Sequence, residues 1–362
     1  MGIDYSLLYR NIVRLYSLIP RYLGNGWGFR PIQVFAEVTY QCNLRCEFCQ
    51  FLRSEEPLVK PGATQLSIEE FKAILSEVPT GGLISFTGGE PFVRKGFLKL
   101  VGEVSRRNKT HIFTNGTLIT EEAAKYLIKL GARHFLTGNG LVAIGISLQG
   151  LEKTHNQIVG RDWAFQRTLM GIESLIKYKQ NKKYPIIELK VVISKKNVGE
   201  LYKLFCLAKD LRVDIFNIMT MNMLPHASRI VATDTSYMQP PPQVEEVNLY
   251  ILKKELQSIE KEAKHSMIQI RTTPQGISFK EILSYYENRF CLKDYTCYFP
   301  WYGVGITAYG DVVICPYVNI GNLKKGKLKK LFNNDKAREF RKKLRKYGIF
   351  PGCLGCCLLT RK

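Results

Sequence analysis

The chain has 362 residues, of which 45% are hydrophobic, and a formal net charge of +22 at pH 7. This length allows one large α/β domain with a smaller appendage and a sizeable core. No apolar run approaches the roughly 20 residues that cross a bilayer, and arginines interrupt the apolar N-terminal segment, which argues against a membrane span and a cleaved signal. We therefore expect a cytoplasmic protein.

Residues 1–32 form an amphipathic segment ahead of the first predicted strand. Apolar residues such as Ile12, Leu15 and Ile19 are interspersed with Arg14 and Arg21. Such a helix can pack across one end of the main domain, or it can lie in the headgroup region of an anionic membrane. Peripheral contact with an anionic membrane is therefore an open alternative to a purely cytoplasmic location.

From residue 33 to about 225, short apolar runs alternate with amphipathic stretches, as in repeated βα units around a parallel sheet. Ser67 and Glu70 form a capping box at the start of one helix, Thr120 precedes the acidic first turn of another, and a third covers residues 163–178. The predicted strands are residues 33–39, 82–87, 110–114, 141–148, 186–193 and 213–219.

Residues 226–290 are predicted to form a bridging helical segment, with a helix from 244 to about 264 and a possible strand at 268–271. Residues 291–362 are expected to form a small cysteine-rich unit with a hairpin around Gly310. A unit of this size needs an additional stabilising link, such as a metal cluster, in order to fold. Between 324 and 346, twelve Lys or Arg face only Asp335 and Glu339. We interpret this run as the solvated face of a helix that turns Ala337, Phe340, Leu344 and Tyr347 inward; attraction to an acidic partner is the alternative.

Nine of the ten cysteines fall into two groups, which favours metal binding over disulfides in a reducing compartment. The first group, Cys42, Cys46 and Cys49, follows the first predicted strand, at the end where α/β barrels carry out chemistry. Three thiolates can hold three corners of a four-iron cluster and leave the fourth iron open to a ligand. Zinc is the alternative, but structural zinc needs four ligands and neither a His nor another Cys lies nearby in the sequence.

The C-x3-C-x2-C spacing, with an aromatic residue before the last cysteine, resembles the radical S-adenosylmethionine (SAM) superfamily. The aromatic residue is Phe48. Gly88, Gly89 and Glu90 match the family's GGE motif, which contacts the amino group of SAM. Asn115 and Ser147 match positions that line the SAM pocket, with Ser147 near the ribose, and Arg161 matches an arginine for the SAM carboxylate.

The resemblance covers residues 33 to about 225 and implies a (β/α)6 partial barrel. It also implies that SAM binds the open iron of a [4Fe-4S] cluster held by Cys42, Cys46 and Cys49, which are thus the catalytic residues. Reductive cleavage then yields a 5′-deoxyadenosyl radical that abstracts hydrogen from a substrate carbon, with the electron supplied by a donor such as flavodoxin or ferredoxin.

The second group resembles the twitch domain, a shortened relative of the SPASM domain. Cys297 and Cys315 flank Gly310 in a C-x12-G-x4-C pattern, and Cys353 and Cys356 form C-x2-C. The resemblance implies one auxiliary [4Fe-4S] cluster held by these four cysteines. Two alternatives stay open: Cys291 or Cys357 could replace one of the ligands, and a zinc ribbon has a similar pattern.

The substrate is not determined by this resemblance. Similar enzymes oxidise amino sugars, modify ribosomal peptides, mature sulfatases or act on lipids, so a small molecule, a peptide and a lipid all remain candidates. With fewer than 33 residues before the first strand, we expect no leader-binding domain. A non-catalytic iron–sulfur electron carrier or a nucleic-acid-binding protein is the alternative of another class, although the basic residues lack the interleaved aromatics that stack on bases.

Overall fold

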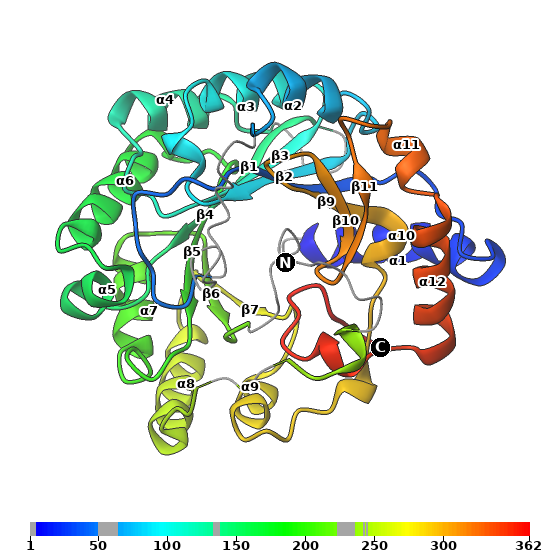
Figure 1. Ribbon diagram of the computed structural model, residues 1–362. Coiled ribbons are helices and arrows are strands. Elements are labelled where there is room, and N and C mark those ends of the chain that lie inside the picture. The colour runs from blue at the N-terminus through cyan, green and yellow to red at the C-terminus, as the bar shows by residue number, and fades with distance from the viewer. Residues whose placement is uncertain (1–4, 50–63, 133–137, 223–235, 242, 244) are drawn as a thin grey trace.

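The computed structural model describes residues 5–49, 64–132, 138–222, 236–241, 243 and 245–362. Parallel strands follow one another around a partial barrel, and helices form an outer ring (Figure 1). The predicted α/β partial barrel is confirmed. The parallel strands are β1 (Gln33–Thr39), β2 (Leu83–Gly88), β3 (Lys109–Thr114), β4 (Gly140–Ser147), β5 (Ile186–Val192), β6 (Ile215–Met219) and β7 (Gln269–Thr273).

The first six of these strands coincide with the six predicted ones, and their ends differ by two residues at most. β7 overlaps the possible strand expected at residues 268–271, but it continues the barrel by pairing in parallel with β6, although the segment was expected to bridge two domains. None of the five residues of β7 is buried. It therefore lacks the apolar run by which a barrel strand is recognised in a sequence.

The outer helices begin at the residues that the capping patterns indicate. The Ser67 hydroxyl and the Glu70 carboxylate form a complete capping box, and Thr120 and Asn248 accept backbone hydrogen bonds at the starts of their helices. The helix predicted from residue 244, which itself lies outside the described residues, begins at Leu249. The ring consists of α2 (Ile68–Leu75), α3 (Phe97–Ser105), α4 (Glu121–Lys129), α5 (Glu152–Val159), α6 (Ala164–Lys179), α7 (Leu201–Asp210), α8 (Leu249–Ala263) and α9 (Phe279–Tyr286).

The cysteine-rich C-terminal residues extend the same sheet. β9 (Gly303–Ile306) pairs in parallel with β1, and the predicted hairpin continues into β10 (Asp311–Cys315) and β11 (Val318–Asn322). Gly310 supplies the left-handed conformation in the turn, with φ +90°. The remaining elements are α10 (Phe299–Tyr302), α11 (Leu328–Leu331), α12 (Asp335–Tyr347), the pair β8 (Tyr295–Thr296) and β12 (Thr360–Arg361), and the 3-10 turns Pro91–Val93, Ser236–Met238, Leu292–Asp294 and Pro351–Cys353.

Helix α12 is less uniformly solvated than its basic sequence indicates. Ala337, Phe340 and Leu344 are buried as expected, but Tyr347 is 55% exposed, so the expectation that it turns inward is wrong. Arg341 is instead fully buried, and its guanidinium donates to the carbonyls of Gly26, Pro300 and Phe332. Backbone carbonyls thus satisfy a buried cation, an arrangement that sequence periodicity does not predict.

The N-terminal helix α1 (Tyr5–Leu23) packs against α10. Val13 and Ser17 are buried, and the Arg21 guanidinium donates to the Thr296 hydroxyl (2.9 Å) and to the Cys297 carbonyl (3.3 Å). α1 therefore packs against the first part of the cysteine-rich unit, around Thr296 and Cys297. Within the described part of the chain, no helix has the length and apolar content to cross a membrane.

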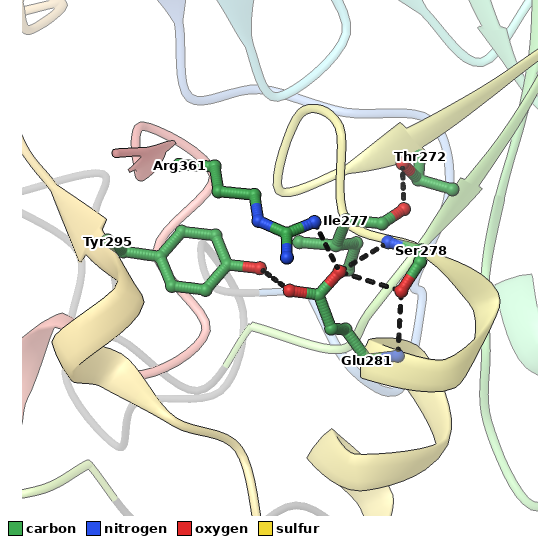
Figure 2. Close-up of polar contacts among 6 residues, drawn as sticks. All are labelled: Thr272, Ile277, Ser278, Glu281, Tyr295 and Arg361. Atoms are coloured by element: carbon green, nitrogen blue, oxygen red, sulfur yellow. Dashed lines mark hydrogen bonds and ion pairs between the residues drawn. The ribbon is translucent and has the colours of Figure 1, made fainter.

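The last residues of the chain return to the barrel, where the red segment lies inside the ring beside β7 (Figure 1). Glu281, in the capping box of α9, anchors them (Figure 2). Its carboxylate accepts a hydrogen bond from the Tyr295 hydroxyl (2.6 Å) and lies 3.6 Å from the Arg361 guanidinium. β8 and β12 are joined at the same place, so the tail has a defined position against the cavity.

Candidate active site

The first cysteine loop follows β1 directly and docks onto the C-terminal end of α5. The backbone N–H groups of Arg45 and Glu47 donate to the carbonyls of Val159 (2.9 Å) and Ile158 (3.0 Å). Leu44, in the middle of the loop, is buried against the same helix end. The loop is thus held mainly by backbone bonds and an apolar anchor.

The three thiols of this loop lie close enough to influence one another. Burial raises the pKa of Cys46 to about 12, and the negative charges of Cys49 and Cys42 raise it further. Burial likewise raises the pKa of Cys42 to about 11, although a hydrogen bond to its sulfur from the Leu44 N–H (3.4 Å) opposes this effect. Thiolates crowded in this way need a positive centre, and this donor set fits an iron–sulfur cluster.

The GGE motif lies against this loop, and its two glycines adjoin the backbone that leads into it. An added Cβ on Gly88 would lie 2.2 Å from the Thr39 carbonyl oxygen, and one on Gly89 would lie 2.2 Å from that of Gln41. The Gly89 and Glu90 N–H groups donate to these same two carbonyls. The glycines therefore allow close contact with the backbone that leads into Cys42.

Glu90 is buried, and its carboxylate joins the second and third strand ends. One oxygen accepts from the Thr114 hydroxyl (2.8 Å) and the Phe92 N–H (3.1 Å), and the other accepts from the Asn115 N–H (2.7 Å). Burial raises the pKa of Glu90 to about 7, against the opposing effect of these hydrogen bonds. A cationic or N–H-bearing ligand would therefore find a carboxylate that titrates near neutral pH.

Asn115 connects Glu90 with the cysteine loop. Its side-chain N–H donates to Asn43 (2.9 Å) and lies 4.0 Å from the Cys42 sulfur. Asn43 in turn donates to the Thr117 hydroxyl (2.8 Å). The sequence analysis did not single out Asn43 or Thr117, although Asn43 lies within the cysteine motif itself, which was the available signal.

A cavity of about 1130 Å³ occupies the barrel and opens beside the cysteine loop. Phe48, Cys49 and Ser147 line it, as does Gln149, which the sequence analysis did not identify. Arg161 does not line the cavity; its guanidinium donates to the carbonyl of Gly160 at 2.9 Å. Of the expected pocket residues, Phe48 and Ser147 line the cavity, whereas Gly88, Gly89, Glu90, Asn115 and Arg161 do not. Glu90 and Asn115 are instead hydrogen-bonded to each other beside the cysteine loop.

The second cysteine group gathers residues that are far apart in the sequence. Cys356 is buried in the main hydrophobic core, and Cys297, Cys315 and Cys353 are partly buried against it. Burial raises the pKa of Cys297 to about 12, and Cys353 adds to that rise; burial and the same neighbour also raise the pKa of Cys315. Four enclosed, mutually close thiols fit a fully ligated cluster.

The two remaining thiols of this group occupy different environments. Cys291 is exposed at the start of a 3-10 turn and lies outside the core cluster that holds the other four. Cys357 is accessible because it lines the barrel cavity. A hydrogen bond with Cys356 lowers its pKa, and the charge of Lys190 acts in the same direction.

Backbone N–H groups point at the sulfurs of both cysteine groups in the same manner. The N–H two residues after the cysteine donates to the sulfur at Cys42, Cys297, Cys315 and Cys356. Hydrogen bonds of this kind stabilise the negative charge of a cluster thiolate. Across the described ranges, no three His, Cys, Asp or Glu side chains are placed to hold a single metal ion.

Comparison with protein families agrees with this geometry. The model of the radical SAM superfamily matches residues 36–193, and that of the SPASM iron-sulfur cluster-binding domain matches residues 297–357. The chain is 28% identical over 210 residues to Fe-coproporphyrin III synthase of Methanosarcina barkeri, covering 57% of this chain and 48% of that one. It is 30% identical over 183 residues to a probable GTP 3′,8-cyclase of Aeropyrum pernix, covering 49% and 48%.

These matches have limits. The chain spans about half the length of the curated relatives it matches. Among solved structures, Streptococcus suis SuiB superposes with a TM-score of 0.62 at 15% identity, over 94% of this chain and 74% of that one. A structure of anSMEcpe with bound AdoMet gives a TM-score of 0.59 at 21% identity, over 86% and 83%. At such identities the likeness shows the fold alone, whereas the family models identify residues 36–193 as a radical SAM domain and residues 297–357 as a SPASM iron–sulfur cluster-binding domain.

Proposed function

We propose that the chain is an enzyme that reductively cleaves SAM and abstracts hydrogen from a substrate carbon by means of the resulting 5′-deoxyadenosyl radical. The observation that carries this proposal is the group of three crowded thiols, Cys42, Cys46 and Cys49, beside Glu90 and Asn115. Three thiolates hold a [4Fe-4S] cluster and leave one iron for SAM. The relatives named above are enzymes, which favours this function over a non-catalytic electron carrier or nucleic-acid-binding protein.

The chain's own residues would position SAM around that cluster. Glu90 accepts hydrogen bonds from the amino group, since its buried carboxylate lies beside the cysteine loop. Phe48, Gly88, Gly89 and Asn115 frame the same end, and Ser147 faces the cavity at the position proposed for the ribose. Arg161 remains the candidate for the SAM carboxylate; it directly follows the helix end onto which the cysteine loop docks.

We infer that an auxiliary [4Fe-4S] cluster is held by Cys297, Cys315, Cys353 and Cys356. The packing of these four thiols in one buried group supports this ligand set over one that includes the exposed Cys291. A donor such as flavodoxin or ferredoxin would supply the electron for SAM cleavage. Because Cys357 and Cys49 line one cavity, a substrate bound there would lie between the two clusters.

The test is anaerobic reconstitution with iron and sulfide, followed by addition of reductant and SAM. We expect about eight irons per chain and formation of 5′-deoxyadenosine. About four irons together with bound zinc would refute the auxiliary cluster. Eight irons without SAM cleavage would leave the chain as an electron carrier and contradict the proposed activity.

A second proposal concerns location, and α1 carries it: we propose that this helix makes peripheral contact with an anionic membrane. Leu15, Ile19 and Leu23 are 65%, 58% and 81% exposed, on the side of the helix away from the buried Val13 and Ser17. The basic helix α12 adjoins the segment that follows α1, because Arg341 donates to the Gly26 carbonyl. An exposed apolar stripe beside a dense positive charge matches the surface of an anionic bilayer.

Cosedimentation with vesicles of phosphatidylglycerol and phosphatidylcholine tests this contact. The triple change Leu15→Ser, Ile19→Ser and Leu23→Ser is expected to lower binding at least about tenfold, because it removes the inserted apolar area. Tyr250→Ser is the matched control, since this side chain is 77% exposed on the distant helix α8. Equal binding of the triple variant and the wild type would refute the membrane contact.

A further inference from the structure

The barrel cavity contains a second polar cluster, on the strands that lie furthest from the cysteine loop along the sheet. Alternation along β5, β6 and β7 turns its members toward the cavity. They stand outside the GGE motif, the SAM pocket positions and both cysteine groups. The cluster consists of Glu188 and Lys190 on β5, Asn217 on β6, and Arg271 and Thr273 on β7, with His111 on β3 facing them.

Glu188 is already paired within this cluster, although its Oε2 atom has no hydrogen-bond partner among the described residues. Its carboxylate accepts a hydrogen bond from the Asn217 amide (2.5 Å) and forms an ion pair with Arg271 (3.2 Å). Thr273 donates to the Asn217 oxygen (3.0 Å), which fixes the orientation of that amide. Burial by itself raises the pKa of Glu188, but Lys190 and Arg271 outweigh it and lower the pKa to about 2. Glu188 is therefore negatively charged, and its contacts with Asn217 and Arg271 hold it in place.

Lys190 has no comparable partner. Among the described residues, no hydrogen bond or ion pair holds its ammonium group, which lies 4.5 Å from the centre of the Phe113 ring. The His111 Nε2 atom is also buried without a hydrogen-bond partner in that part of the chain. Both groups flank Gly145, where an added Cβ would lie 2.9 Å from the Lys190 stem and 3.5 Å from His111 Nε2. Two unsatisfied polar groups thus adjoin each other on the cavity wall.

The charges of this wall do not balance. Lys190 and Arg271 are basic, whereas Glu188 is the single carboxylate of the cluster. Burial lowers the pKa of Lys190, and the negative charge of Glu188 opposes that effect. A partly buried cation without an ion-pair partner is costly unless an anion neutralises it. The wall has the character of a site for a negatively charged group.

We propose that Lys190 and Arg271, with Glu188 and Asn217 holding Arg271 in place and His111 nearby, bind an anionic oxygen group of the substrate, either a carboxylate or a phosphate. This inference rests on the proposed function, because it places the substrate in the cavity beside the SAM site. Lys190 pairs across the sheet with Ser147, so the anion would lie one strand away from the residue assigned to the ribose. The neutral part of the substrate would then extend toward the cysteine loop.

The experiment is calorimetric titration of the anaerobically reconstituted, SAM-loaded enzyme with two probes, succinate and inorganic phosphate. We expect one of them to bind, and the one that binds assigns the anion as a carboxylate or a phosphate. Lys190→Met should weaken that binding by at least about tenfold, as expected for loss of a charge-assisted hydrogen bond. Lys190→Arg should retain it within about threefold, because the charge is kept.

Lys182→Met is the matched control, since Lys182 lines the same cavity but is exposed. Equal loss of binding in this variant and in Lys190→Met would show that only the general positive charge of the cavity attracts anions. Failure of both probes to bind the wild type would also overturn the proposal. 5′-Deoxyadenosine formation, measured in the same samples, reports on the proposed function separately: anion binding without SAM cleavage would leave the binding site standing and refute the activity.

Discussion

The two cysteine groups differ in completeness and surroundings rather than in the chemistry of their thiols. In both groups burial raises the thiol pKa and N–H groups point at sulfur. The first group offers three thiols on a loop at the edge of the cavity, next to a buried carboxylate. The second gathers four thiols in and against the main hydrophobic core. An incomplete ligand set at a cavity serves reaction, whereas a complete set within the core serves structure or electron transfer.

The sharpest test of this difference is removal of one thiol from each group. Cys42→Ala is expected to lower SAM cleavage by at least about 10³-fold and to remove about four irons, because the cluster that binds SAM is lost. Cys353→Ala should also remove about four irons but keep SAM cleavage within about tenfold. Iron analysis and chromatographic measurement of 5′-deoxyadenosine check both changes, with Cys206→Ala as a control outside both groups. If both variants lost cleavage equally, the division of roles would be wrong.

The next expected effect concerns the carboxylate that distinguishes the first group. Glu90→Gln should weaken SAM binding about 10- to 100-fold, because a charged acceptor at the amino group is replaced by a neutral one. In the wild type, burial holds the pKa of Glu90 at about 7, so SAM affinity should fall as the pH drops from 8 to 6 and the carboxylate takes up a proton. Equilibrium dialysis at several pH values measures this dependence. An equally steep pH profile in Glu90→Gln would assign the titration to another group.

A smaller effect separates the members of the second group from one another. Cys291→Ala is expected to leave the iron content and absorption spectrum of the reconstituted protein unchanged, since this thiol is exposed and lies outside the core cluster. Cys315→Ala should lose about four irons and the corresponding absorbance. The reverse result would place Cys291 among the ligands and Cys315 outside them.

The smallest expected effect tests the anchor of the C-terminal tail that carries Cys353 and Cys356. Glu281→Ala removes the acceptor of Tyr295 and the partner of Arg361, which should lower the free energy of unfolding by about 1–2 kcal/mol and the melting temperature by about 2–4 °C. Glu287→Ala is the control, because its partner Arg289 is exposed. Thermal unfolding of the reconstituted proteins provides the measurement, and equal melting temperatures for the two variants would contradict the anchoring role.

Much of the site was predictable because its chemistry is local in the sequence. The spacing of Cys42, Cys46 and Cys49 identifies the cysteine loop, and the capping box of Ser67 and Glu70 places a helix with its first residue. The same logic gives only a possible strand for β7, because none of its residues is buried and its apolar pattern is weak. It fails for Arg341, which the basic run conceals although the side chain is buried.

The sequence by itself determined the order of strands and helices, the two cysteine groups and the family to which they belong, because these depend on periodicity and on short spacings. Only the tertiary structure decided that four cysteines spread over sixty residues share one core, and that Lys190 meets His111 across Gly145 while Glu188 meets Arg271. The physical reason is that a curved parallel sheet brings alternate residues of separate strands to one cavity. The sequence pattern of a single strand shows only which of its residues face inward. Which residue of a neighbouring strand each of them contacts depends on the register between the strands.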